Sequence, residues 1–145
     1  MDWGGPALSA SFVVDASVGF AWVYPGQATP ETDQLLKEVA AGAMGTVPGL
    51  WYLEMANVLL IAQRRHRLTA VQRQAALEQL MAMQFTVDEE GTRQAFIKTS
   101  ELAEKHGLTI YDATYLELAL RRSLPLATRD AALKTAARQC GVKAL

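Results

Sequence analysis

Short segments rich in β-branched and aromatic residues alternate along this chain with longer segments that carry the start and stop signals of helices. The predicted strands are 12–14, 44–47, 85–87 and 125–127, and 142–145 is a candidate fifth strand at an edge. Strands that alternate with helices usually form a parallel sheet joined by right-handed crossovers. The order therefore predicts one α/β domain with a mostly parallel central sheet of four or five strands flanked by helices.

The predicted helices have recognisable ends. Thr29 and Thr69 are hydroxyl caps, Pro30 suits a first helical turn, and Gly42 and Gly107 suit positions just after a helix. The predicted helices are 15–22, 29–42, 50–63, 69–84, 92–105, 112–122 and 130–139. The apolar composition of 50–63 predicts a helix that is buried on most sides.

The size and composition of the chain are those of a single domain. It has 145 residues, 50% of them hydrophobic, which is enough for a core without disulfides or structural zinc. Residues 1–10 lack the features of a secretory signal and are expected to be a disordered leader or an expression remnant, ahead of a single domain at 11–145. No apolar segment reaches the ~18 residues of a membrane helix, and the single Cys140 fits a reducing cytoplasm.

Four acidic residues lie far apart in the sequence, at predicted strand ends, helix starts or inside an apolar helix: Asp15, Glu54, Asp112 and Asp130. The carboxyl ends of parallel strands open onto one crevice, so residues remote in sequence can converge there. Carboxylates held together repel one another and need a cation, and oxygen ligands favour Mg²⁺ or Mn²⁺ over zinc. The pattern predicts a metal-binding carboxylate cluster, and so a hydrolase.

Each aspartate has a plainer alternative, because a carboxylate before a helix often accepts hydrogen bonds from the first free amides. If the aspartates are only caps, the chain is a noncatalytic α/β module for protein interaction, and metal would not raise its melting temperature. Glu54 fits that alternative less well, since an unpaired carboxylate in an apolar helix must find a partner or take up a proton. Asn57, one turn later, either lines the same wall or makes a structural hydrogen bond.

A phosphotransfer receiver domain is a further alternative, because it also gathers acids and Mg²⁺ at strand ends. Such a domain has paired acids after an early strand and a lysine after a late one. Here the first predicted strand is followed by Asp15 alone.

Four blocks of the sequence resemble, in order, those of the PIN-domain family, and most of all its VapC-type ribonuclease toxins. The blocks are 12–18, 54–59, 111–119 and 127–130, so the likeness runs from Phe12 to the C-terminus. The resemblance implies a parallel sheet flanked by helices and a Mg²⁺- or Mn²⁺-dependent endoribonuclease acting on transfer or ribosomal RNA. It also implies a homodimer and a cognate antitoxin that blocks the site.

The resemblance assigns roles to the acids. Asp15 and Asp112 match the two central metal ligands of the family, and Glu54 and Asp130 match the acids that complete the catalytic set. Another acid often follows the third one by about a turn in relatives. Glu117 is the nearest candidate here, with a solvent-facing residue as its alternative.

Neutral polar residues are expected around these ligands. Ser17 and Thr128 occupy positions where the family often has hydroxyls near the site, and Asn57 is the third residue expected to support the cluster. His66 and His106 lie at predicted helix ends away from the acidic blocks and are expected at the surface. A histidine-based nuclease is therefore not expected.

An acidic site repels an RNA backbone, so cations must hold the substrate. Arg129 is the strongest candidate because it adjoins Asp130, and Arg64 and Arg65 follow, although cations at a helix end also suit the helix dipole. Further candidates are Arg67, Arg73, Arg121 and Arg122. The net charge of −1 argues against a protein that coats nucleic acid with a basic surface.

Overall fold

Four parallel strands form the centre of the fold, in the order β3-β2-β1-β4. The structure is a computed structural model that describes residues 11–145, so the expectation for 1–10 lies outside the described residues. The strands are β1 (Phe12–Val14), β2 (Gly45–Pro48), β3 (Phe85–Asp88) and β4 (Leu126–Ala127). Every residue of β1 is buried, as expected for a strand covered on both faces. The prediction of an α/β fold with a parallel sheet is confirmed.

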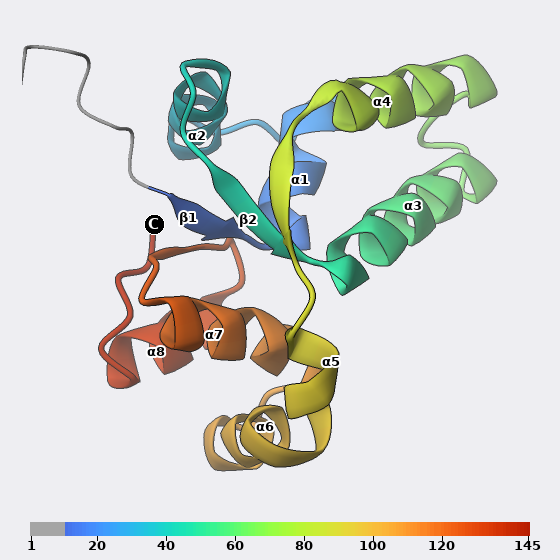
Figure 1. The fold of residues 1–145 in the computed structure, drawn as a ribbon. Coiled ribbons are helices and arrows are strands. Elements are labelled where there is room, and N and C mark those ends of the chain that lie inside the picture. The colour runs from blue at the N-terminus through green and yellow to red at the C-terminus, as the bar shows by residue number, and fades with distance from the viewer. Residues whose placement is uncertain (1–10) are drawn as a thin grey trace, which may run out of the picture.

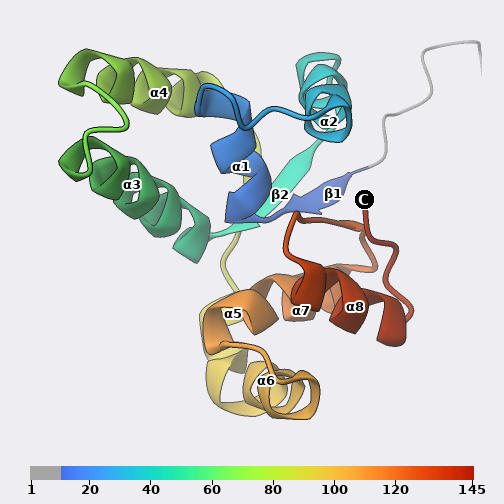
Figure 2. The same cartoon turned by 180° about the vertical axis from the view of Figure 1, so that it is seen from behind.

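The helices cover both faces of this sheet. Figures 1 and 2 show α1 (Ala16–Val23), α2 (Pro30–Ala40), α3 (Gly49–Arg64) and α4 (Ala70–Ala82) on one side. On the other side lie α5 (Gly91–Gln94), α6 (Ser100–His106), α7 (Ile110–Arg122) and α8 (Ala131–Gln139). Helix α7 contacts β1, β2 and β4, so it lies directly against the sheet.

Local signals place the helix ends close to where the sequence predicts them. The Thr29 hydroxyl accepts a hydrogen bond from the Thr32 amide at 3.1 Å, and the Thr69 hydroxyl accepts one from the Gln72 amide at 3.0 Å. Gly107 follows α6 with a φ of 64°, a left-handed conformation that glycine adopts at little cost. These three helix-end predictions are confirmed.

Three details of the fold differ from the sequence predictions. The helix predicted at 92–105 is divided by a π-helical turn, η1 (Ala95–Thr99), between α5 and α6. The candidate fifth strand is reduced to a single bridge between Leu126 and Ala144. Helix α3 is not buried on most sides: Trp51 is buried on its inner face, whereas Leu53 is 71% exposed. Among the described residues α3 packs mainly against α1, α4 and β2, which leaves its other face open to solvent.

The core lies on both sides of the sheet and leaves little spare room. Trp51 of α3 and Tyr115 of α7 are among the largest fully buried side chains. A Cβ atom at Gly45 would lie 2.6 Å from the ring of Phe85, so glycine at this position leaves room for that ring over β2. Among residues 11–145, the structure contains no helix that combines the length and the apolarity of a membrane span.

Candidate active site

Asp15 directly follows β1 and is only 5% exposed. Its Oδ2 atom accepts hydrogen bonds from the Ser17 hydroxyl at 2.6 Å and from the Thr128 hydroxyl at 2.7 Å. Burial raises the pKa of the Asp15 carboxyl, while these two hydroxyls act in the opposite direction. Asp15 precedes α1 but makes no side-chain capping bond; the Ala16 and Ser17 amides lower its pKa less than the two hydroxyls do, so the cap alternative does not account for this residue.

Glu54 projects from the second turn of α3, and the phenol of Tyr115 on α7 donates a hydrogen bond of 2.6 Å to its Oε1 atom. The sequence predicted that this carboxylate needs a partner, and Tyr115 is that partner. Partial burial raises the pKa of Glu54, the Tyr115 bond lowers it, and the charges of Asp15 and Asp112 raise it again.

Asp112 lies in the first turn of α7 rather than before it. Thr109 caps this helix instead, because its hydroxyl accepts the amide hydrogen of Asp112 at 3.0 Å. Burial raises the pKa of Asp112, and the charges of Asp15 and Asp130 raise it further. The cap alternative is therefore wrong for Asp112 as well.

Asp130 is the one aspartate of the three that does cap a helix. Its Oδ1 atom accepts the Leu133 amide hydrogen of α8 at 2.8 Å. Its charge nevertheless raises the pKa of Asp112, so it also lies near the other acids. Asp130 therefore both caps α8 and acts through its charge on Asp112, so the two roles are compatible.

The structure thus brings together Asp15, Glu54, Asp112 and Asp130, which come from β1, α3, α7 and the β4–α8 turn. Within residues 11–145, no group of three acidic, histidine or cysteine side chains is arranged to enclose a metal ion. Mg²⁺ keeps several waters and usually takes one or two carboxylates directly. The four convergent carboxylates, whose mutual repulsion a cation would relieve, therefore fit a hydrated divalent ion.

The predicted supporting residues differ in their contacts. Ser17 accepts the Arg129 amide hydrogen at 2.9 Å, and Thr128 accepts the Asp130 amide hydrogen at 3.0 Å, while both hydroxyls donate to Asp15. They therefore connect the turn after β1 to the turn after β4. Asn57 is exposed on α3, one turn beyond Glu54, and its supporting role stays a prediction.

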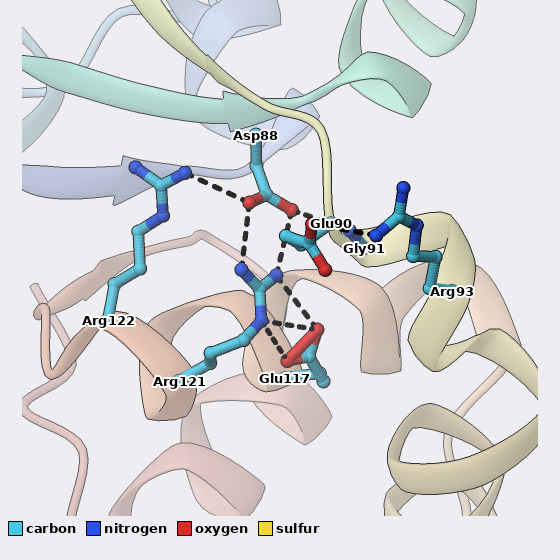
Figure 3. A network of polar contacts seen from close by, with 7 residues as sticks. All are labelled: Asp88, Glu90, Gly91, Arg93, Glu117, Arg121 and Arg122. Carbon is cyan, nitrogen blue, oxygen red and sulfur yellow. Dashed lines mark hydrogen bonds and ion pairs between the residues drawn. The ribbon is translucent and has the colours of Figure 1, made fainter.

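A second polar cluster, which the sequence did not reveal, lies at the carboxyl end of β3 (Figure 3). Asp88 accepts hydrogen bonds from Arg121 Nη1 and Nη2, both at 2.8 Å, from Arg122 at 3.1 Å and from the Gly91 amide at 2.9 Å. The Nε atom of Arg121 also lies 2.8 Å from Glu117 Oε2. The hydrogen bond from Arg121 lowers the pKa of Asp88, against the effect of burial.

This second cluster corrects two expectations. Glu117 neither faces solvent nor adds to the acidic site, because it is 3% exposed and paired with Arg121. Arg121 and Arg122 are engaged by Asp88 rather than held out for RNA. The sequence held a signal for Asp88, an acid directly after the predicted strand 85–87; in the structure Asp88 is the last residue of β3 and pairs with Pro48.

Most of the other predicted cations lie at the surface, including Arg67, whereas Arg73 is half-buried and donates a hydrogen bond of 3.1 Å to Gln63. Arg129 is exposed beside Asp130 and its Nη1 atom lies 3.4 Å from Gln27 Oε1. Arg64 and Arg65 are exposed at the end of α3. His66 is exposed as predicted, but His106 is half-buried, and its Nε2 atom lies 3.3 Å from the Cys140 sulfur.

Comparison with known proteins was made for the sequence and for the fold. The family model described as the PIN domain matches residues 12–139, nearly the whole described chain. The chain belongs to the PIN-domain family. Members of this family are generally nucleases that work with divalent metal ions. The predicted family is therefore confirmed. Comparison with curated proteins gave no match.

Solved structures share the fold. PAE2754 from Pyrobaculum aerophilum aligns with a TM-score of 0.69 and 23% identity over 96% of this chain and 92% of that one. VapBC2 from Rickettsia felis, bound to a DNA fragment from their promoter, aligns with a TM-score of 0.65 and 13% identity. The alignment covers 93% of this chain and 97% of that one. FitAcB from Neisseria gonorrhoeae aligns with a TM-score of 0.65 and 17% identity over 92% of this chain and 96% of that one. At these identities the likeness establishes the fold of this PIN domain.

Proposed function

We propose that this PIN domain is a Mg²⁺- or Mn²⁺-dependent endoribonuclease and the VapC-type toxin of a type II toxin–antitoxin pair. The observation that carries the proposal is the convergence of carboxylates from β1, α3, α7 and the β4–α8 turn. Asp15 and Asp112 do not cap their helices, so a purely structural role does not account for them. A cation would make such a costly arrangement favourable.

In this proposal Asp15, Asp112, Glu54 and Asp130 hold the ion. When bound, the ion lowers the pKa of a water that attacks the phosphodiester and offsets charge on the phosphoryl oxygens. The chain's own contribution is to keep the ligands in place: Ser17 and Thr128 fix Asp15, and Tyr115 fixes Glu54.

The substrate and partners follow from the same proposal. RNA, of the transfer or ribosomal class, is held by Arg129 together with Arg64 and Arg65, which lie exposed at the surface. A cognate antitoxin blocks the site, the toxin forms a homodimer, and it acts in the cytoplasm. The similarity in fold to chains of VapBC2 supports an antitoxin partner.

Metal removal provides the first test of this function. We expect cleavage of pooled transfer and ribosomal RNA in Mg²⁺ or Mn²⁺ and its loss in EDTA, because the carboxylates cannot supply the ion's charge themselves. Gel analysis of labelled RNA measures the cleavage, and re-addition of Mg²⁺ should restore it. Cleavage that persists in EDTA, or that is equal in the Asp15→Asn variant, would reject the proposal or reveal a contaminating nuclease.

Tyr115→Phe tests how Glu54 is held. Loss of the phenol removes the 2.6 Å hydrogen bond to Glu54 while keeping the buried ring. We expect a loss of roughly 10–100-fold in metal affinity or cleavage rate, the usual effect of removing a partner of a metal ligand. Titration of cleavage rate against Mg²⁺ measures it. Tyr111→Phe, on the exposed first turn of the same helix, should leave the titration unchanged.

A further inference from the structure

A cavity of about 280 Å³ lies beside the acidic site, between α1, the start of α2 and the β4–α8 turn. Thr128 belongs to both places, since it lines this cavity and its hydroxyl donates to Asp15 at 2.7 Å. The cavity therefore adjoins Asp15 through this residue. Its other polar lining residues are Thr29, Glu31, Thr32, Arg129 and Lys134.

Two cationic side chains line the cavity and have hydrogen-bond donors without an acidic partner among residues 11–145. Neither Arg129 nor Lys134 forms an ion pair within residues 11–145, although Asp130 lies one turn before Lys134 on α8. The hydroxyls of Thr29 and Thr128 are already donated, to Thr32 and Asp15. The free side-chain donors of the cavity are thus cationic, and Glu31 is the one acidic side chain among its lining residues.

We propose that this cavity binds a phosphate of the RNA strand next to the one that is cleaved, through Lys134 and Arg129. The inference rests on the proposed RNA cleavage and deepens it, because it identifies the side from which the strand leaves the acidic site. A polyanion near four carboxylates needs positive charge close by, and these two side chains provide it from the β4–α8 turn and the first turns of α8.

The test measures RNA affinity separately from cleavage. In the non-cleaving Asp15→Asn background, anisotropy of a labelled unstructured single-stranded RNA is recorded over a range of salt. Lys134→Gln is expected to weaken binding roughly tenfold at low salt, the size of one charge-assisted hydrogen bond. It should also flatten the plot of log affinity against log salt by about 0.7, the value for one phosphate on a single strand.

Three further variants separate charge from structure. Lys105→Gln removes an exposed lysine on α6 and should change neither affinity nor slope. Lys134→Arg should retain binding, because the charge remains. Glu31→Gln should tighten binding, because it removes the one acidic side chain that lines the cavity. A merely structural role for these side chains would not produce opposite signs for Lys134 and Glu31.

The outcomes distinguish this subsite from the function on which it rests. If the parent binds RNA and wild-type protein cleaves it, but Lys134→Gln keeps the parental affinity and slope, the subsite is wrong and the nuclease stands. If the parent binds no RNA and the wild type cleaves none, both proposals fall. The subsite is supported if Lys134→Gln weakens RNA binding and Lys105→Gln leaves the RNA affinity unchanged.

Discussion

Arg121→Met is expected to lower the free energy of unfolding by about 3 to 5 kcal/mol, the usual cost of removing one partner from a buried ion pair. The side chain of Asp88 is fully buried and that of Glu117 is 4% exposed, so both would lose the cation that neutralises them. Arg122 still reaches Asp88, which favours the lower end of the range. Chemical denaturation near neutral pH measures the loss.

Arg93→Met is the matched control for this variant. Arg93 and Glu90 also form an ion pair, but their side chains are 77% and 53% exposed, so its loss should cost about 0–1 kcal/mol. Equal losses of stability for the two variants would show that the cluster contributes no more than a surface pair.

The contribution of Asp88 to stability has a defined pH window. The pKa of Asp88 is lowered in the folded state, so the stabilisation is present above about pH 3.8 and is lost as pH falls below that value.

Asp15→Asn is expected to reduce RNA cleavage by roughly 10³-fold or more, because a metal ion contributes several kcal/mol of charge stabilisation. The amide oxygen can still accept from Ser17 and Thr128, so the fold should be retained. Initial rates of cleavage in Mg²⁺ measure the loss. Asp33→Asn, an exposed aspartate in the first turn of α2, should leave the rate unchanged.

The same substitution should make the metal-free protein more stable. Burial raises the pKa of Asp15, so the folded state binds the proton more tightly than the unfolded state. Wild-type protein without metal therefore loses stability as pH rises through that raised value, whereas asparagine has no proton to lose. In EDTA at neutral pH the Asp15→Asn variant should have the higher melting temperature. In saturating Mg²⁺ the wild type should have the higher melting temperature. A lower melting temperature of the variant in EDTA would contradict this account.

Features of the fold that depend on neighbouring residues could be predicted from the sequence. Thr29 and Thr69 receive amide hydrogens from residues three positions later, so their capping role is visible in a few letters. The π-helical turn and the exposure of Leu53 depend instead on which elements pack together. Periodicity alone predicts neither feature. The sequence therefore wrongly predicted a continuous helix over 92–105 and a helix at 50–63 that is buried on most sides.

The acids of the candidate site illustrate the same limit. The sequence identified Asp15, Asp112 and Asp130 but could not separate caps from residues with free carboxylates, because the answer depends on distant groups such as Thr128. For Asp112 a local signal existed, since Thr109 three residues earlier forms the start of a capping motif. Asp88 was missed because its partner, Arg121, lies 33 positions away.

The order of the strands has a consequence for biosynthesis. The β1 strand pairs on one side with β4. The Asp15 carboxylate accepts a hydrogen bond from the hydroxyl of Thr128, which follows β4. A ribosome must therefore translate most of the domain before the first strand and its aspartate acquire their last contacts. The proposed RNA cleavage depends on this pocket and would therefore appear late in synthesis, so the growing polypeptide would not cleave the RNA of the ribosome that makes it.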